Sequence, residues 1–277
     1  MTQHGFWLKR RCIKSSLTIY QIFKKIFTTE QILRPMKIKR IAVMQPTYLP
    51  WCGYFALLDY VDEFVLLDNV QYSHQSWQQR NRIKGPNGAI LLTVPVLSNS
   101  KRSKINKVLI DNSSIPLLKH LKSIRHSYFN SDFYPEISSR LDPIFSSPTT
   151  SLSDLNCFLI KEISNILTIS TPVIKASDLV SVGVKDNLLL SICDELGADE
   201  YVSPPGSSVY LDGSSAFKNV GVKLSYFDFV HPTYEQKFGS FISHLSVIDM
   251  LFNVGAKHSM KLIRGGVNKP PIDELEN

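Results

Sequence analysis

The chain has 277 residues, of which 43% are hydrophobic and 20% are charged, with a formal net charge of +7. This composition is sufficient for a hydrophobic core in one large or two small domains, and it excludes a disordered or collagen-like protein. The four cysteines are dispersed and form no C-x-x-C pair, so we predict reduced thiols, no metal site and no cofactor.

Most of the positive charge lies in the first 35 residues. The charged residues there are Lys9, Arg10, Arg11, Lys14, Lys24, Lys25 and Arg34 against Glu30, which gives +6 of the +7. Because the rest of the chain is nearly neutral, no nucleic-acid surface is predicted on the folded body. We interpret the segment as a basic extension in contact with solvent, RNA or anionic lipid, as a transit-like leader, or as a stretch upstream of a native start at Met36, which we favour.

These features divide the chain into three expected parts. They are a basic extension over residues 1–35, a single domain over residues 36–270 and a polar tail over residues 271–277. Apolar residues in the extension are interrupted by Lys24 and Lys25, so they do not reach the roughly 20 positions that a membrane-spanning helix requires. No secretory signal is recognisable, and a cytoplasmic location is predicted.

A buried strand, a Pro-rich aromatic turn and a helix are predicted in this order between residues 41 and 61. The helix is indicated by apolar residues at the spacing i, i+3, i+4 and i+7, namely Tyr54, Leu57, Leu58 and Val61. A strand followed by a loop and a helix N-terminus is the usual place for an anion in an α/β protein. We therefore expect functional residues here.

Further elements follow along the chain. Strands are predicted over residues 63–68, 89–94, 200–202 and 222–229, and helices over residues 117–128, 152–166, 186–196 and from 246 to an end at Gly255. A strand, a helix and a strand within about thirty residues indicate a right-handed parallel crossover. The predicted fold is α/β, with a mainly parallel sheet, flanking helices in a Rossmann-like or nucleotidyltransferase-like arrangement, and a helical insertion in the middle of the chain.

Several motifs resemble the WbqC-like protein family. They are QPTYLPWCGY at 45–54, LDNVQY at 67–72, QRNRIKGPNG at 79–88, LGADEYVS at 196–203, His231-Pro232 and LSVIDMLFN at 245–253. The resemblance covers roughly residues 38–255. It implies a component of bacterial surface-polysaccharide biosynthesis of the O-antigen type, and it carries no established catalytic residues over to this chain.

The turn after the first strand supplies the first candidate site. Its pattern is similar to the HxGH loop of nucleotidyltransferases, with Trp51 and Tyr54 in the places of the two histidines. Aromatic rings can stack on a base or a sugar but cannot offer a cationic contact to phosphate. We predict substrate contacts for Gln45, Tyr48, Trp51 and Tyr54; the alternative is a packed aromatic corner without a ligand.

A second candidate site follows the second strand. Asp68 ends that strand, at the edge where α/β proteins bind ligands. Arg80 and Arg82 are separated by one residue and can present a fork to phosphate or carboxylate, unless they are solvated or paired with acids. The predicted substrate residues in this stretch are Gln71, Gln79, Arg80, Asn81, Arg82 and Lys84.

The remaining candidates lie in later segments. His231 and Glu235 in one loop can form an acid/base pair near neutral pH, although a histidine after a strand can also be a hydrogen-bonded structural residue. Ser203 and Tyr210 belong to a candidate substrate loop. The predicted catalytic residues are His231, Asp68, Glu235 and His120.

The sequence contains no G-x-G-x-x-G, Walker lysine loop, H-E-x-x-H, G-x-S-x-G or paired D-x-D. This argues against a dinucleotide oxidoreductase, a P-loop kinase, a zinc protease, a serine hydrolase and a D-x-D glycosyltransferase. We predict a small anionic substrate and a transferase that adds an acyl or aminoacyl group to a nucleotide-linked amino sugar. The alternatives are a degenerate nucleotidyltransferase that uses ATP or CTP, and a non-catalytic protein that binds a nucleotide sugar or assists assembly.

Overall fold

The computed structural model describes residues 38–207, 211, 216–218 and 221–268. The following description concerns the unit over residues 39–277. The predicted basic extension, the polar tail over residues 271–277 and the candidate Tyr210 lie outside the described residues.

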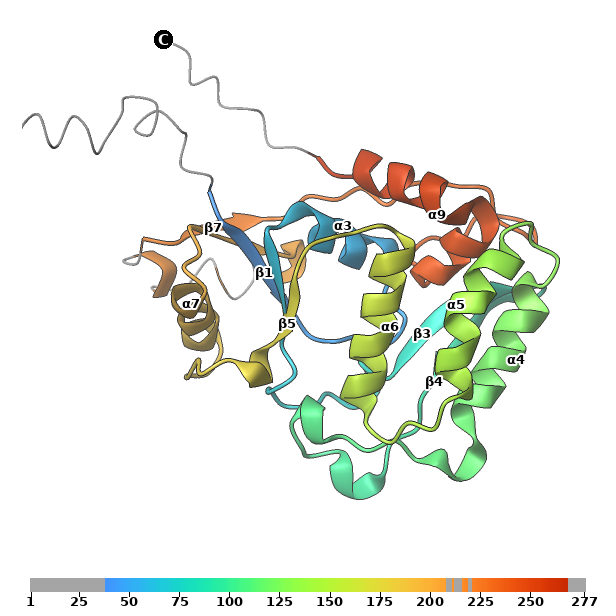
Figure 1. Ribbon diagram of the computed structural model, residues 1–277, viewed down its shortest axis with the longest axis horizontal. Helices are drawn as coiled ribbons and strands as arrows, with labels where there is room; N and C mark the ends of the chain where they lie inside the picture. Colours follow the sequence, from blue (N-terminus) through green and yellow to red (C-terminus); the bar gives the residue numbers. More distant parts are fainter. Residues whose placement is uncertain (1–37, 208–210, 212–215, 219–220, 269–277) are drawn as a thin grey trace, which may run out of the picture. The chain divides into compact units, whose positions relative to one another are not determined.

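A five-stranded parallel sheet organises this unit (Figure 1). The strands, in their order across the sheet, are β5 (Val173–Lys175), β2 (Glu63–Leu66), β1 (Arg40–Met44), β6 (Glu200–Ser203) and β7 (Lys223–Tyr226). Each strand pairs with its neighbours in the parallel sense. β2 and β5 lie on one side of β1, and β6 and β7 lie on the other. The order of the strands therefore reverses direction between β1 and β6, which is the switch point of the sheet.

The two faces of the sheet pack against different helices, because successive strand residues point to opposite sides. Ala42 and Phe64 face a large cluster that contains α3, α6 and α9, whereas Ile41 and Val65 face a smaller cluster that contains α7. Figure 1 shows α7 and α6 on opposite sides of the sheet. The bounds of the covering helices are α3 (Cys52–Tyr60), α6 (Leu152–Ile166), α7 (Asp186–Glu195) and α9 (Val247–Gly265). The α/β fold predicted from the sequence is confirmed.

A β-hairpin and a group of helices are inserted between β2 and β5. The hairpin consists of β3 (Arg80–Gly85) and β4 (Gly88–Thr93), which pair antiparallel. The inserted helices are α4 (Pro116–Tyr128), α5 (Tyr134–Ser146) and α6. Short 3₁₀ turns complete the described elements: η1 (Ser98–Ser100), η2 (Ile105–Lys107), η3 (Asn112–Ser114), η4 (Ala176–Asp178), η5 (Pro205–Ser207) and η6 (Ala216–Lys218). The predicted helical insertion is therefore present, within the residues that the structure describes.

Helix α9 continues past the glycine at which we expected it to end. Gly255 has φ 75° and ψ 166° inside the helix, so the chain is kinked there and resumes a helical path to Gly265. A Cβ atom at Gly255 would lie 2.5 Å from the ring of Phe133. Glycine is required here because the backbone is left-handed and because another side chain approaches closely. Of the helices in the described ranges, none is both long and apolar enough to cross a membrane.

Candidate functional site

A cavity of about 920 Å³ lies at the carboxyl ends of β1, β2 and β6. We call it the strand-end cavity. It is lined by residues that follow β1 and β2 and by the first turn of α7, so it sits at the switch point between β1 and β6. Open α/β sheets bind ligands at this position, and the volume suits a drug-sized or nucleotide-sized molecule.

The strand-end cavity has an apolar wall and a polar rim. The apolar wall consists of Val43, Met44, Leu67, Val70, Val184, Leu188, Leu189, Tyr201 and Pro204, and the polar residues are Gln45, Thr47, Asn69, Gln71, Lys104 and Lys185. Tyr201 is nearly fully buried and its ring stacks on Phe217 at a centroid distance of 5.5 Å. A ring or a sugar face can rest on such a wall while polar groups of the ligand meet the rim.

The charges that line the strand-end cavity are positive. Lys104 and Lys185 are exposed there, and neither lysine forms an ion pair with a described residue. Lys185 immediately precedes α7, whose N-terminus adds a positive partial charge that Asp186 in the first turn partly offsets. Among the described lining residues no carboxylate is present, so the cavity favours an anion.

Asn69, a residue of the polar rim, has one buried side-chain atom without a hydrogen-bond partner among the described residues. Its Nδ2 donates to the backbone oxygen of Ala176 at 3.3 Å, while its Oδ1 is buried and receives no hydrogen bond from the described residues. Gln45 lies on the same rim, and its Oε1 accepts from Nε2 of Gln78 at 2.7 Å, which leaves its own amide to donate.

Asp68, which follows β2, does not line the strand-end cavity, although its neighbours Leu67 and Asn69 do. The carboxylate of Asp68 is only 1% exposed and is held by Ser177, whose backbone N–H donates at 2.9 Å and whose hydroxyl donates at 2.7 Å. Successive residues of an extended segment point to opposite sides, which explains this division. Asp68 thus connects the end of β2 to η4.

His231 lies outside the strand-end cavity, and its ring contacts that of Trp51, the residue just before α3. The two rings are 5.9 Å apart and nearly parallel, and His244 stacks on Trp51 at 5.2 Å. We call Trp51, His231 and His244 the imidazole stack. Two residues that the sequence placed in separate candidate sites are therefore neighbours, and none of the three lines the strand-end cavity.

Both ring nitrogens of His231 have hydrogen-bond partners. Nδ1 lies 2.8 Å from the backbone oxygen of Pro232, and Nε2 accepts from the backbone N–H of His244 at 3.1 Å. This pattern fits a neutral ring with its proton on Nδ1. Burial lowers the pKa of His231 below its ordinary value, and the neighbouring His244 lowers it further. A general base at this position must first release Nε2 from His244. Glu235 in the same loop is exposed.

Several predicted site residues are built into the protein interior. Tyr48 is fully buried and its hydroxyl lies 2.7 Å from Nδ1 of His120, whose pKa is lowered to about 4 by burial. Asn81 donates to the backbone oxygens of Tyr48 and Leu49 at 3.2 and 2.6 Å. Tyr54 is buried, and its hydroxyl donates to the backbone oxygen of Gln45 at 3.3 Å. These contacts fix the turn that carries Gln45.

Lys84 is also buried, with 1% of its surface exposed. Its Nζ donates to the backbone oxygens of Gly239 and Ser240 at 3.3 and 2.6 Å. The carboxylate of Asp249 accepts from the hydroxyls of Tyr128 and Tyr234 at 2.6 and 2.8 Å. Burial raises the pKa of this carboxyl group above its ordinary value, and the two hydroxyls and the charge of Lys84 oppose the rise. This network joins β3 and α9 to the loop that carries the imidazole stack.

The two predicted arginines have different neighbours. Arg80 and Gln79 line a second, smaller cavity beside the hairpin, whereas the guanidinium of Arg82 lies 5.9 Å from the ring centroid of Trp77. Ser203 is fully buried and its hydroxyl lies 2.5 Å from that of Ser207. The predicted residues are thus distributed among the strand-end cavity, the imidazole stack, the smaller cavity and the interior.

Of the predicted substrate residues, Gln45 and Gln71 line the strand-end cavity. Asn69, Lys104 and Lys185 were not named as site residues from the sequence. The signal for Asn69 was its place directly after a predicted buried strand. Lys185 precedes a predicted helix, whereas Lys104 lay in a stretch that the sequence indicated only as an exposed basic loop.

Comparisons with known proteins show one matching family model and one similar curated protein. The sequence model of the WbqC-like protein family matches residues 45–261, which include the imidazole stack and all residues lining the strand-end cavity except Val43 and Met44. An uncharacterized protein of Mycobacterium tuberculosis (strain ATCC 25618 / H37Rv), Rv1507c, is 35% identical over 223 residues, which are 79% of this chain and 96% of that protein. No solved structure matches the chain.

Proposed function

The chain belongs to the WbqC-like protein family, and from this premise we propose that it is a cytoplasmic transferase that modifies a nucleotide-linked amino sugar for bacterial surface polysaccharide of the O-antigen type. The sugar nucleotide binds in the strand-end cavity, and an acyl or aminoacyl group is transferred to the sugar's amino group. The observation that carries the proposal is a cavity at the switch point of the sheet whose described lining holds two exposed lysines, neither ion-paired with a described residue, and no carboxylate.

Each part of such a ligand has a counterpart in the strand-end cavity. Lys104 and Lys185 suit the phosphates, because charge-assisted hydrogen bonds to phosphate oxygens are the strong ones. The side-chain amide of Gln45, whose Oε1 is already hydrogen-bonded to Gln78, can donate to a sugar hydroxyl. The apolar wall that includes Tyr201 suits the face of a base or a sugar ring.

The proposed reaction forms an amide bond. The sugar's amino nitrogen attacks the carbonyl carbon of an activated acyl or aminoacyl donor, the bond from that carbon to the leaving thiol or hydroxyl breaks, and a base accepts the proton of the amine. His231 is the base that we propose, as from the sequence. Because its Nε2 accepts from His244 and the imidazole stack does not line the strand-end cavity, this role requires the stack to open and the sugar's amino group to reach it when substrate binds.

A second candidate function is binding without catalysis. It is favoured by the hydrogen bonds of the proposed acid/base groups, since Asp68, His120 and His231 each use their reactive atoms in contacts with the protein. A binder of this kind would deliver or retain a nucleotide sugar for another enzyme. Binding with the same residues but without turnover would support it.

The test is a thermal-stabilisation screen of the purified chain, followed by calorimetric titration and a turnover assay. UDP-glucosamine and a dTDP-linked amino sugar are the acceptor probes, each with and without acetyl-coenzyme A, and UDP-N-acetylglucosamine, UDP, ATP and CTP are tested for binding. A ligand present at 100 times its dissociation constant stabilises a protein by about 2.7 kcal/mol, which such a screen detects. Preference for ATP or CTP over every sugar nucleotide would favour the degenerate nucleotidyltransferase instead.

The variant that tests the cavity is Lys104→Gln/Lys185→Gln. We expect sugar-nucleotide affinity to fall about tenfold or more, because two charged contacts to phosphate are lost. The matched control is Lys107→Gln/Lys161→Gln, which removes the same charge from two exposed lysines that do not line the cavity. Equal affinity in both variants would refute the proposed site.

A further inference from the structure

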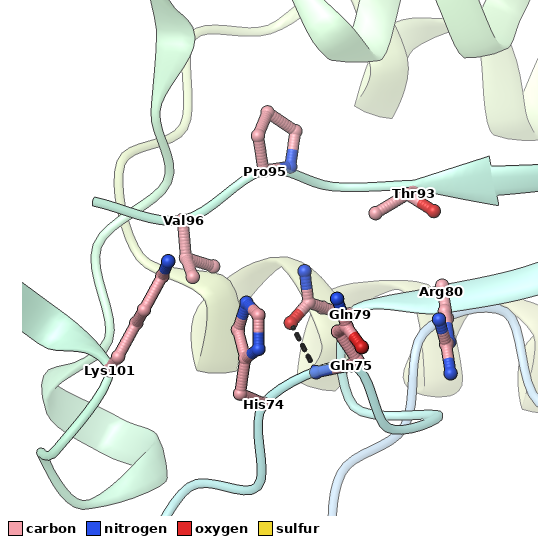
Figure 2. A pocket seen from close by; sticks show the side chains of 8 residues that line it. All are labelled: His74, Gln75, Gln79, Arg80, Thr93, Pro95, Val96 and Lys101. Carbon is pink, nitrogen blue, oxygen red and sulfur yellow. Dashed lines mark hydrogen bonds between the residues drawn. The ribbon is translucent and has the colours of Figure 1, made fainter. Parts of the chain in front are cut away.

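A second cavity lies between the β3–β4 hairpin and the turn before it. It has a volume of about 370 Å³. We call it the hairpin pocket, and its polar lining consists of His74, Gln75, Gln79, Arg80, Thr93 and Lys101. Pro95 and Val96 complete the wall. Figure 2 shows His74 and Gln79 between Lys101 on one side and Arg80 on the other.

Positive charge converges on the hairpin pocket without a counter-charge. Arg80 and Lys101 both line it, and no carboxylate does among the described residues. Neither Arg80 nor Lys101 forms an ion pair within the part of the chain that the structure describes. Asp111 is close, since its N–H donates to the backbone oxygen of Pro95, but its carboxylate accepts from the N–H of Ser113 at 3.0 Å. The pocket therefore attracts an anion.

Hydrogen bonds within the protein hold Gln79 and the neighbouring turn in the wall of the hairpin pocket. Oε1 of Gln79 accepts from the hydroxyl of Tyr72 and from the backbone N–H of Gln75 at 3.1 Å, and Nε2 donates to the backbone oxygen of Val94 at 3.1 Å. Gln75 has φ 59°, a left-handed conformation that is unfavourable for this residue type. Strain of this kind persists where surrounding contacts enforce it and is concentrated at ligand sites.

The hairpin pocket is distinct from the strand-end cavity. The two cavities share no lining residue, and the segments that carry Gln71 and Lys104 run side by side between them, with the N–H of Tyr72 donating to the oxygen of Ser103 at 3.0 Å. The same two segments present Gln71 and Lys104 to one cavity and His74 and Lys101 to the other. A volume of 370 Å³ is near the lower end for ligand pockets and suits a small molecule.

We propose that the hairpin pocket is a second binding site, for a small molecule that carries an oxyanion, either a phosphate or a carboxylate. Arg80 holds the oxyanion through its planar fork, Lys101 adds a charge from the opposite side, and the hydroxyl of Thr93 supplies a hydrogen bond. The fixed turn at Gln75 preorganises the site, which lowers the entropy lost on binding. This site does not depend on the function proposed for the strand-end cavity.

Calorimetric titration with inorganic phosphate and with succinate, at ionic strength matched with sodium chloride, tests the proposal and separates the two kinds of oxyanion. We expect at least one of them to bind the parent protein with a dissociation constant of about 10 mM or lower. The variant Arg80→Gln/Lys101→Gln is expected to bind about tenfold or more weakly. The control is Arg102→Gln/Lys107→Gln, which removes the same charge from two exposed residues outside the pocket.

Two results would overturn the proposal: failure of both oxyanions to bind the parent protein, or equal affinity in the two double variants. If the double variant does not fold, the exposed Lys101→Gln alone is expected to weaken binding about threefold or more, and an unchanged affinity would refute the site. Because Lys104 and Lys185 are themselves proposed to bind phosphate, Lys104→Gln/Lys185→Gln is expected to lose that contribution and to retain the phosphate binding that Arg80→Gln/Lys101→Gln removes. Loss of phosphate binding in that variant would assign the anion to the strand-end cavity instead.

Discussion

Replacing Lys84 by methionine separates a structural role for this residue from the substrate contact that the sequence suggested. The side chain is 1% exposed, and Nζ donates to Ser240 and Gly239 at 2.6 and 3.3 Å. Lys84→Met keeps the length of the side chain but leaves these two carbonyl groups and the carboxylate of Asp249 without a cation. Removal of one partner of a buried charged network costs about 3–5 kcal/mol.

This loss corresponds to a large change in melting temperature. At about 2–4 °C per kcal/mol for a folded unit of this size, we expect Tm to fall by roughly 6–20 °C. Differential scanning calorimetry measures it, and Lys107→Met is the control, because Lys107 is exposed and should change stability by less than about 0.5 kcal/mol. A Lys84→Met protein that melts at the parental temperature but binds sugar nucleotides weakly would refute the reasoning and make Lys84 a binding residue.

The same variant has a predicted pH dependence. Burial raises the pKa of Asp249, and the charge of Lys84 opposes the rise. A carboxyl group whose pKa is higher in the folded than in the unfolded state destabilises the fold above the folded pKa, and this effect disappears below the unfolded pKa. Lys84→Met raises the folded pKa further. The difference in unfolding free energy between variant and parent should therefore be largest at neutral pH and shrink toward about pH 4.

Three further changes test other parts of the account. Gly255→Ala should lower the free energy of unfolding by about 1–3 kcal/mol, because it places a Cβ atom 2.5 Å from Phe133 at a residue with positive φ. The control Gly265→Ala has open space around the new Cβ atom and should not lower it. Equal effects of the two changes in a denaturant titration would contradict this reasoning. His231→Gln should lower turnover about 100-fold or more while sugar-nucleotide affinity is retained, and parental turnover would move the base to Asp68, Glu235 or His120. Deletion of residues 1–35 should change Tm by less than about 1 °C, since a basic stretch with interrupted apolar patterning buries little surface, and a larger drop would show that it packs on the fold.

The sequence predicted those elements whose burial is continuous along the chain. β1, α3 and β2 follow one another, and each has the pattern of apolar residues expected for a buried strand or an amphipathic helix. The sequence therefore predicted the parallel crossover. β3 was not predicted, because Arg80–Gly85 is rich in charged and polar residues and its alternation was interpreted as a ligand motif. α5 was missed because Pro143 lies inside it, and β5 because three half-buried residues at a sheet edge give no pattern.

The residues of the strand-end cavity were harder to predict from the sequence than the fold, because the tertiary structure brings them together. Asn69, Lys104 and Lys185 come together only through the parallel topology and the course of two loops, and no spacing in the sequence records that proximity. The sequence did indicate the strand ends as the functional edge, and it named Gln45 and Gln71. It could not predict that Asp68 turns to Ser177, or that Trp51 packs against His231, because both depend on tertiary contacts.

Hydrogen–deuterium exchange with and without a saturating sugar nucleotide tests the central proposal most directly. The account predicts that backbone amides around Asn69 and Gln71, near Lys104 and in the first turn of α7 become protected when UDP-N-acetylglucosamine or the tightest ligand of the screen is bound, because these segments line the strand-end cavity. Protection confined to the hairpin pocket or to the imidazole stack, with unchanged exchange from Gly183 to Leu189, would contradict it.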